Sequence, residues 1–287
     1  TAAGGILLLG LRETPAHAAC QRLVRLRGGR REGRRVFCPS AEYATVRDGL
    51  EAACKGDLTV VRQGEHRMDK SVWIGNRTLA LEGDPAGGTC VVGKWVLREG
   101  SNGCVSGMSL VLDWREPEVD WAGECVPGEE DETLQGFTVL VRGGRWGFDR
   151  CRVEASSSPG GGESAIIVAS GSNVSASSSH IGGQGQGAAR VDSGLTVTGN
   201  AIVSLDDCLV SLCSSFGIKA LDKVRIAVAG GAVGQCRVGL MLGDEVEVRM
   251  KGARVVGDED GAAFQVEERA RYTAKLFLTE THVRGQK

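Results

Sequence analysis

The second half of the chain repeats one short pattern of apolar and polar positions. The pattern spans eight residues, with apolar side chains at the first, third and eighth positions and, in most copies, a small one at the sixth. These four positions recur six times, at Trp146, Phe148, Cys151 and Val153; Val174, Ala176, Ser179 and Ile181; Val203, Leu205, Cys208 and Val210; Ile226, Val228, Gly231 and Val233; Val248, Met250, Ala253 and Val255; and Leu276, Leu278, Thr281 and Val283. Successive copies begin 28, 29, 23, 22 and 28 residues apart, which is the length of one solenoid coil made of several short strands.

The alternation of apolar and variable positions predicts strands, because successive side chains of a strand point to opposite faces. The two residues before the small position are where the chain turns a corner, and a small side chain there lets the coils stack about 4.8 Å apart. A second motif, Ala or Gly followed by two apolar positions, predicts another strand in each coil. It occurs at Ala165, Ile166 and Val168; Ala188, Ala189 and Val191; Gly217, Ile218 and Ala220; Gly239, Leu240 and Leu242; and Ala263, Phe264 and Val266. Helical repeats would need apolar residues at three- and four-residue spacing, which no stretch after Gly56 provides.

The start of the solenoid is less regular. Three alternating strands are predicted at 58–61, 71–74 and 78–81, separated by Gly-containing turns. Before them, Val46, Leu50, Ala53 and Cys54 have helical spacing and follow Thr45, a residue suited to be an N-cap. An uncovered end of a solenoid exposes apolar core and unpaired strand edges, so this short amphipathic helix is expected to cap the first coil.

The order of features from Tyr43 to Cys90 is a short helix, Gly56-Asp57, an apolar strand, a glycine before a polar strand, and the run Leu79-Ala-Leu-Glu-Gly-Asp84. This order resembles the opening of right-handed parallel β-helix proteins of the pectin-lyase-like superfamily. It looks like the non-catalytic repeats of F-box adaptors and related eukaryotic scaffolds, and like carbohydrate-active enzymes. The resemblance covers residues 43–287 and implies an all-β right-handed parallel β-helix with a short N-terminal capping helix. Since this fold hosts unrelated activities, the resemblance specifies the fold far better than the function.

The enzymes of that superfamily carry motifs that this chain lacks. The chain does not contain the polygalacturonase motifs Asn-Thr-Asp, Gly-His-Gly and Arg-Ile-Lys in the arrangement found in those enzymes. It also lacks the Gln-Ala-Val and Asp-Phe-Ile-Phe-Gly segments of pectin methylesterases. The best enzyme hypothesis is a row of acidic residues at one corner of the coils, in which Asp149 and Asp206 lie two coils apart. Their separation of about 10 Å is near the upper limit of the distance between the two carboxyl groups of an inverting glycosidase. Its candidate catalytic residues are Asp149, Arg152, His180, Asp206 and Asp207. The alternative is structural, because Asp favours corners for local hydrogen-bonding reasons.

Cysteines and histidines have simpler interpretations. The chain has ten cysteines, but Cys151 and Cys208 fall at the inward small position, where Cys acts as a compact apolar residue. With irregular spacing and no CxxC pair, the cysteines argue against a disulfide framework and favour a reducing intracellular compartment. His180 and His282 occupy equivalent outward positions on distant coils, so we expect solvated imidazoles and no metal site. The glycine-rich run 182–187 lacks the Lys-Ser/Thr of a phosphate loop and is interpreted as a loop.

Two segments depart from the solenoid. Residues 113–135 carry nine acidic residues and one Arg, which predicts a solvated insertion in which Trp114 and Trp121 could anchor to the coil surface. Residues 1–42 form a separate N-terminal segment with an expected short helix from Thr14 and seven arginines within fourteen residues. Of these, Arg30, Arg31, Arg34 and Arg35 are candidate binding residues for an anionic surface or a neighbouring protein.

Composition narrows the function classes. The chain of 287 residues has 43 Gly and only 5% aromatic residues, as expected for short strands and corners, and is long enough for one elongated core. A net charge of −2 argues against nucleic acid, and no apolar run could span a membrane. We therefore expect a non-catalytic β-helix scaffold that binds other protein subunits without a cofactor or metal. The alternative is a polysaccharide lyase or glycoside hydrolase acting on uronate-type polymers, against which the scarcity of Trp and Tyr argues.

Overall fold

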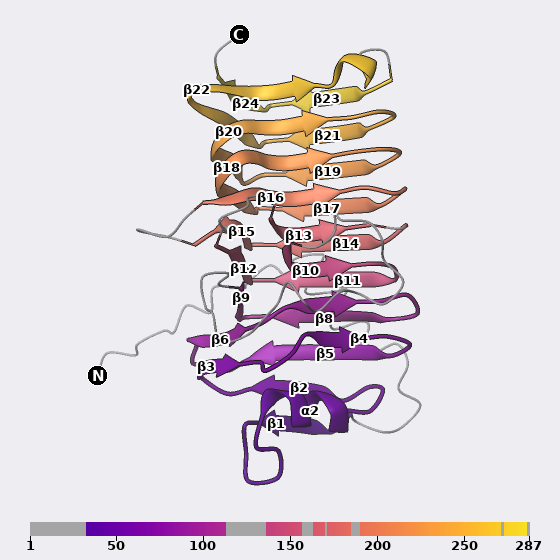
Figure 1. Cartoon of the computed structure of the whole chain (residues 1–287), viewed down its shortest axis with the longest axis vertical. Helices are drawn as coiled ribbons and strands as arrows, with labels where there is room; N and C mark the ends of the chain where they lie inside the picture. Colours follow the sequence, from indigo (N-terminus) through magenta and orange to yellow (C-terminus); the bar gives the residue numbers. More distant parts are fainter. Residues whose placement is uncertain are drawn as a thin grey trace, which may run out of the picture.

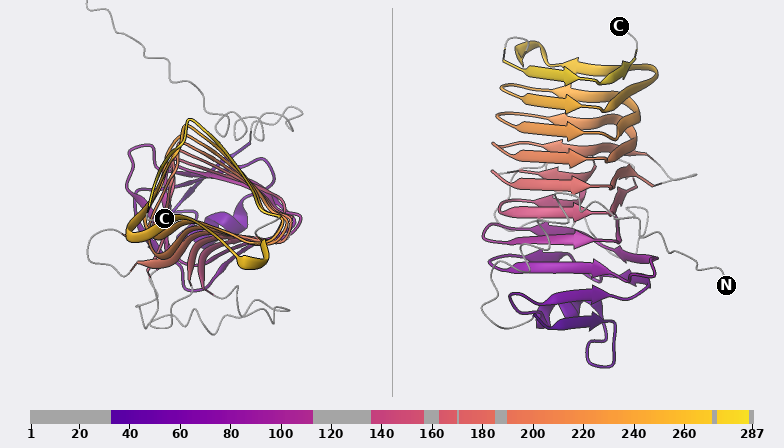
Figure 2. Two further views of the ribbon diagram at one scale, coloured as in Figure 1. Left: turned by 90° about the horizontal axis from the view of Figure 1, so that it is seen from above. Right: turned by 180° about the vertical axis from the view of Figure 1, so that it is seen from behind.

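The computed structural model describes residues 33–112, 136–156, 163–169, 171–184, 190–270 and 273–285. In these residues the chain winds into a parallel β-solenoid that is triangular in cross-section (Figures 1 and 2). Every strand pairs in parallel with the strand of the next coil, so that the coils stack in register along one axis. The predicted all-β fold is therefore confirmed.

One face of the solenoid is a sheet of ten strands, here called sheet A. Its order is β1 (Arg35–Cys38), β2 (Leu58–Val61), β5 (Thr78–Gly83), β8 (Asn102–Ser106), β11 (Arg145–Asp149), β14 (Asn173–Ser177), β17 (Ile202–Asp206), β19 (Arg225–Ala229), β21 (Glu247–Lys251) and β23 (Lys275–Thr279).

The other two faces belong to a second sheet, sheet B, which has two arms. The first arm contains β3 (Gly64–Arg67), β6 (Thr89–Val92), β9 (Ser109–Leu112), β12 (Arg152–Ala155) and β15 (His180–Gly183). The second arm contains β4 (Val72–Ile74), β7 (Trp95–Leu97), β10 (Phe137–Val141), β13 (Ser164–Val168) and β16 (Val191–Val197). In the later coils the arms merge into the long strands β18 (Leu209–Ala220), β20 (Ala232–Leu242) and β22 (Arg254–Val266), and β24 (His282–Arg284) pairs with β22.

The corner after each sheet A strand is a two-residue bend from β8 onward. Its first residue has a left-handed backbone in every coil, with φ between 47° and 68° at Gly107, Arg150, Ser178, Asp207, Gly230, Gly252 and Glu280. In the six copies of the sequence pattern this residue is the second of the two that precede the small position. The corner therefore lies one residue later than predicted, and the small side chains at Cys151, Ser179 and Cys208 are buried at its second position.

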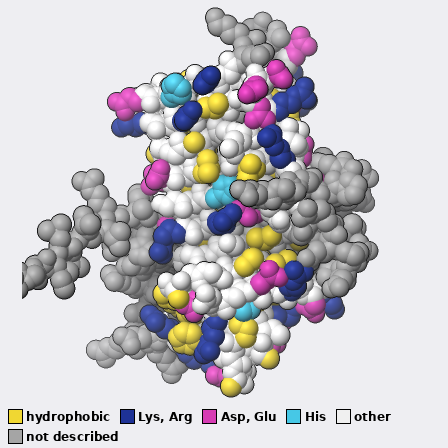
Figure 3. Space-filling model, turned by 90° about the vertical axis from the view of Figure 1, so that its left-hand side faces the viewer, with side chains coloured by type: hydrophobic (Ala, Val, Ile, Leu, Met, Phe, Trp, Pro, Cys, Tyr) yellow, Lys and Arg dark blue, Asp and Glu magenta, His cyan; other side chains and the backbone are white. Residues whose placement is uncertain are grey.

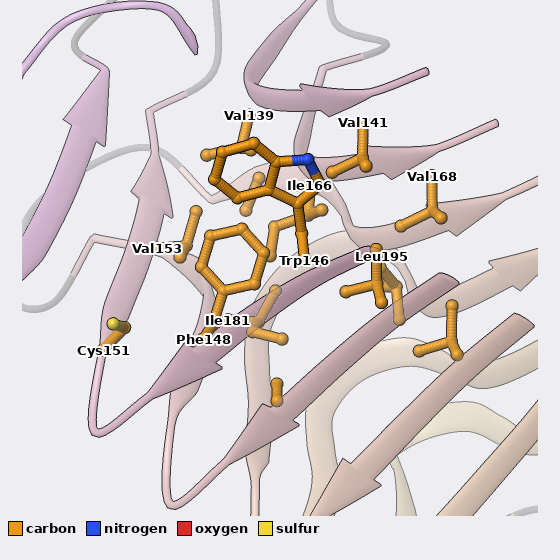
Figure 4. Close-up of a cluster of buried hydrophobic side chains, with 14 of the residues drawn as sticks. Val139, Val141, Trp146, Phe148, Cys151, Val153, Ile166, Val168, Ile181 and Leu195 are labelled. Atoms are coloured by element: carbon orange, nitrogen blue, oxygen red, sulfur yellow. The ribbon is translucent and has the colours of Figure 1, made fainter. Parts of the chain in front are cut away.

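The apolar positions of the repeat form the interior. Figure 4 shows the rings of Trp146 and Phe148 lying beside one another among Val139, Val153 and Ile181, and all five are buried in one continuous core. The last copy is different, because its coil has a neighbour on one side only, and its inward residues Leu278 and Val283 are 43% and 41% exposed.

The N-terminal end carries the expected helix, α2 (Val46–Ala52). Thr45 is its N-cap and forms a capping box with Asp48, since each side chain accepts a hydrogen bond from the backbone of the other residue. Val46 and Leu50 are buried in the core of the first coils, where Figure 1 places the helix. The only other helix in the described part of the chain is the short η2 (Glu268–Ala270).

Three expectations need correction. Strand β1 and strands β6 to β10 were not located by any motif, and Gly182-Gly183, expected in a loop, lie in β15. The second motif was also placed wrongly in one coil. Leu195 pairs with Ile166 and Ile218, so the copy is Gly194, Leu195 and Val197; Val191 pairs with Cys213 instead, and Ala188 and Ala189 lie outside the described residues.

Cysteines follow the expected pattern with one exception. Burial raises the pKa of the Cys151 thiol to about 12, which keeps it a neutral, compact core side chain as predicted. Cys104, by contrast, is disulfide-bonded. The spacing of the cysteines, which argued against a disulfide framework, did not indicate this bond.

Candidate functional site

The expected ladder of acidic residues lies at the end of sheet A, beside the bend. Asp149, Ser177 and Asp206 occupy one register column, so the two carboxylates are two strand spacings apart, about 10 Å, as predicted. Ser177 Oγ donates to Asp149 Oδ1 at 2.6 Å, and Arg150 Nε contacts Asp149 Oδ2 at 3.0 Å. Asp149 is only 4% exposed, and each of its carboxylate oxygens contacts a neighbouring side chain.

The other proposed catalytic residues meet elsewhere, on the outer face of the first arm of sheet B. His180 of β15 is the register neighbour of Arg152 of β12, and both side chains turn to the carboxylate of Glu154. His180 Nδ1 lies 2.9 Å and Arg152 Nη2 2.6 Å from Glu154 Oε1. The structure therefore brings together His180 and Arg152 but neither with the aspartates. Asp207 lies at the first position of an exposed bend.

His180 also contacts a serine of the following coil. Its Nε2 lies 2.9 Å from Ser211 Oγ, on the opposite side of the ring from Glu154. The histidine side chain is only 16% exposed, which corrects the expectation of a solvated imidazole at this position. In Figure 3, which faces the first arm, a histidine at the middle of the surface lies among side chains of both charge signs. His282, at the equivalent position of β24, is exposed as expected.

The position of Gly182 explains how one ring reaches two coils. Glu154, Gly182 and Ser211 are consecutive members of one register column, so the glycine lies between the carboxylate and the hydroxyl. Because Gly182 has no side chain, the imidazole of His180 can lie over this position and contact both Glu154 and Ser211. A Cβ at Gly182 would lie 1.8 Å from the carbonyl oxygen of Ser211, so only glycine fits there.

Electrostatics fix the charge of this cluster. Burial by itself would raise the pKa of Glu154, but the hydrogen bonds from His180 and Arg152 outweigh it and hold that pKa below its usual value of 4.5. Glu154 is therefore an anion at neutral pH and accepts a hydrogen from His180 Nδ1. In the neutral imidazole with its hydrogen on Nδ1, Nε2 can accept a hydrogen bond from the Ser211 hydroxyl.

A second feature is a shallow hollow on the outer face of sheet A. It measures about 620 Å³ and crosses five neighbouring strands, β14, β17, β19, β21 and β23. Small side chains form its floor, at Ser175, Ser204, Ala227 and Ala229. Polar and charged groups and one aromatic ring line it, namely Asp206, Arg249, Lys251, Thr279 and Phe277. Phe277 is 49% exposed, with the Arg249 guanidinium 5.3 Å from the centre of its ring.

The predicted binding residues are divided between described and undescribed parts. Arg34 donates from Nη2 to the Ala52 carbonyl at the end of α2 and lies 3.7 Å from Asp57, and Arg35 is exposed on β1. Arg30, Arg31, Trp114 and Trp121 lie outside the described residues, as does the acidic segment 113–135. Their proposed binding roles stay predictions.

None of the described helices is long and apolar enough to cross a membrane. Within the described ranges, no three His, Cys, Asp or Glu side chains are grouped so that they could hold a metal ion.

Comparison with known proteins bears on the fold. The sequence matches no family model and no curated protein. Among solved structures, it is similar to pectin methylesterase PemA from Erwinia chrysanthemi, with a TM-score of 0.52 and 9% identity over 88% of this chain and 89% of that one. A pectin methylesterase from Aspergillus niger aligns at a TM-score of 0.49 and 12% identity, over 89% and 86% of the two chains. The chain thus has the right-handed parallel β-helix fold that the resemblance implied.

Proposed function

We propose that this chain is a binding β-helix that holds a uronate-containing polysaccharide along the hollow of sheet A. The observation that carries the proposal is the hollow itself, an open trough across five stacked strands. At a strand spacing of about 4.8 Å the trough is roughly 19 Å long, which suits an extended polymer better than a compact ligand.

The lining chemistry favours a polar chain with negative charge. Ser and Thr hydroxyls offer donors and acceptors to sugar hydroxyls, and the exposed ring of Phe277 offers an apolar surface to a sugar face. Arg249 and Lys251 line the hollow together with Asp206. Glu247 accepts a hydrogen bond from Arg249 Nε at 2.7 Å, but the guanidinium is 71% exposed, so its Nη groups can donate to a uronate carboxylate, which a neutral sugar lacks. That the fold is also that of a pectin methylesterase supports a carbohydrate as the ligand class.

The positions of Asp149 and Asp206 favour binding of a polysaccharide over cleavage of its glycosidic bonds. A glycosidase needs two carboxyl groups that face one bond, with room for a water or a sugar between them. Here Asp149 is buried and bonded to Ser177 and Arg150, so Asp206 has no second carboxylate beside it in the hollow, as far as the described residues show. The hypothesis of a scaffold for protein subunits stays a prediction beside this one.

Titration of the protein with polygalacturonate and with a neutral glucan tests the proposal. Arg249→Gln/Lys251→Gln should weaken binding of the uronate polymer about tenfold, equivalent to about 1.4 kcal/mol, because each substitution removes a cation from the lining. Lys55→Gln, which removes one exposed cation near the N-terminal end, is the control and should bind as wild type does. Wild-type protein that binds no polymer, or a double variant of unchanged affinity, would contradict the proposal.

A further inference from the structure

The cluster on sheet B has the connectivity of an acyl-transfer triad. A hydroxyl, an imidazole and a carboxylate form one chain of two hydrogen bonds, Ser211 Oγ to His180 Nε2 and His180 Nδ1 to Glu154 Oε1, each 2.9 Å long. Activation of a serine requires a base within about 2.6–3.2 Å and a third group that orients the base. We propose that Ser211 is the nucleophile of an ester hydrolase site in which His180 is the general base and Glu154 its positioning residue.

The carboxylate of Glu154 has the charge that its positioning role requires. Glu154 is held as an anion by Arg152 and His180, so it accepts the hydrogen of Nδ1 and leaves Nε2 free to accept from Ser211. In these contacts Arg152 bonds only to the carboxylate of Glu154, through Nε at 2.9 Å and Nη2 at 2.6 Å. The guanidinium therefore fixes the orientation of Glu154 without competing for the nucleophile.

The register of the solenoid leaves room on the far side of the serine. Ser211 lies between Gly182 and Gly234 in its column, so neither neighbouring strand places a side chain directly above or below it. His180 occupies the side of Gly182. On the other side, a Cβ added at Gly234 would be in ordinary van der Waals contact with Val256, at 3.6 and 3.8 Å, so there is room for a methyl-sized group beside that glycine. Because Ser211 is only 3% exposed, this space suits a small acyl group, such as acetyl, better than a long chain.

The reaction balances without a cofactor. Ser211 Oγ attacks the carbonyl carbon of an acyl ester while its proton passes to His180 Nε2. The bond from the carbonyl carbon to the alcohol oxygen then breaks, and the leaving alcohol takes that proton. Water attacks the acyl-serine with His180 again as base, which releases the carboxylic acid and restores the hydroxyl. The substrate class is a short-chain O-acyl ester, and this site does not depend on the hollow of sheet A.

Labelling of the intact protein with a fluorophosphonate tests the nucleophile directly. We expect one adduct, located on the peptide that contains Ser211, and hydrolysis of 4-nitrophenyl acetate above that of heat-unfolded protein. Ser211→Ala should abolish the adduct, and His180→Gln should slow hydrolysis by about 100-fold or more, as expected for loss of a general base. Ser109→Ala, an outward serine of β9 on the same sheet face, is the matched control and should label as wild type does.

A merely structural role for the cluster would give different results. In that case folded wild-type protein, verified by its circular dichroism and melting temperature, would form no adduct and would hydrolyse the ester no faster than the unfolded chain. That result would overturn the proposal, as would a Ser211→Ala variant with the wild-type rate. Neither outcome affects polysaccharide binding by sheet A, which is measured separately.

Discussion

A single buried charge at Val228 tests the register of the solenoid. Val228 lies in β19, is 4% exposed, and pairs with Leu205 on one side and Met250 on the other. Val228→Asp loses roughly 1.5–3 kcal/mol of apolar burial and leaves a carboxyl group without a hydrogen-bond partner, which costs roughly a further 1–3 kcal/mol. The free energy of unfolding should fall by about 2.5–6 kcal/mol, which corresponds to a drop in melting temperature on the order of 10 °C.

The neighbouring residue provides the control. Ala227 lies on the same strand but points outward, and its register neighbours are Ser204 and Arg249. Ala227→Asp places a carboxylate beside a guanidinium in solvent, so stability should change by no more than about 0.5 kcal/mol. Thermal and urea unfolding followed by circular dichroism measure both variants. Equal melting temperatures would refute the assignment of alternate residues to opposite faces.

Three further changes probe the helix cap and the sheet B cluster. Thr45→Ala removes the side-chain acceptor of the capping box and should cost about 1 kcal/mol in urea unfolding, whereas the exposed Glu51→Ala should cost much less. Gly182→Ala should lower the melting temperature markedly because its Cβ overlaps the Ser211 carbonyl, while Gly234→Ala has space; similar melting temperatures would contradict that geometry. Because the pKa of Glu154 is lowered by its contacts with His180 and Arg152, its ionised form stabilises the fold above about pH 4.5, and this contribution is lost as pH falls through the folded pKa. The stability of wild type relative to Glu154→Gln should therefore fall below that pH in unfolding titrations, and parallel curves for the two proteins would refute the assigned contacts.

The sequence predicted the fold best where the interior imposes a strict alternation. Cys151, Val203 and Met250 could be placed inward because each coil repeats the same requirement for apolar and small side chains. Strand β3 was indicated only by the resemblance, as a polar strand after a glycine, because Gly64–Arg67 has mostly exposed residues and no alternating pattern. The error in β16 has a different origin, since Val191 begins an extended strand whose defining motif follows only at Gly194.

The candidate site was harder to predict because it occupies positions that the repeat leaves unspecified. Arg152 and His180 were identified, but Glu154 and Ser211 were not, although an alignment of the copies places them in one column with Gly182 between them. That shared column could have indicated that Glu154 and Ser211 lie close together. The pairing of His180 with both residues depends on the side-chain conformation of the histidine, which no periodicity encodes.

The constant two-residue bend has a consequence for how such a molecule tolerates change. From β8 onward the bend keeps its length, whereas the spacing of the coils varies between 22 and 29 residues over the six copies of the repeat. In the coil between β21 and β23, four of the six additional residues follow the end of β22 and two lie within β22, between Val255 and Ala262. In the two shorter coils, β18 and β20 run unbroken across the corner of sheet B. Insertions and deletions are therefore accommodated at the other corners, while the constant bend keeps the coils stacked in register. Those corners are the places where foreign peptide segments could be grafted without shifting the hydrophobic ladder.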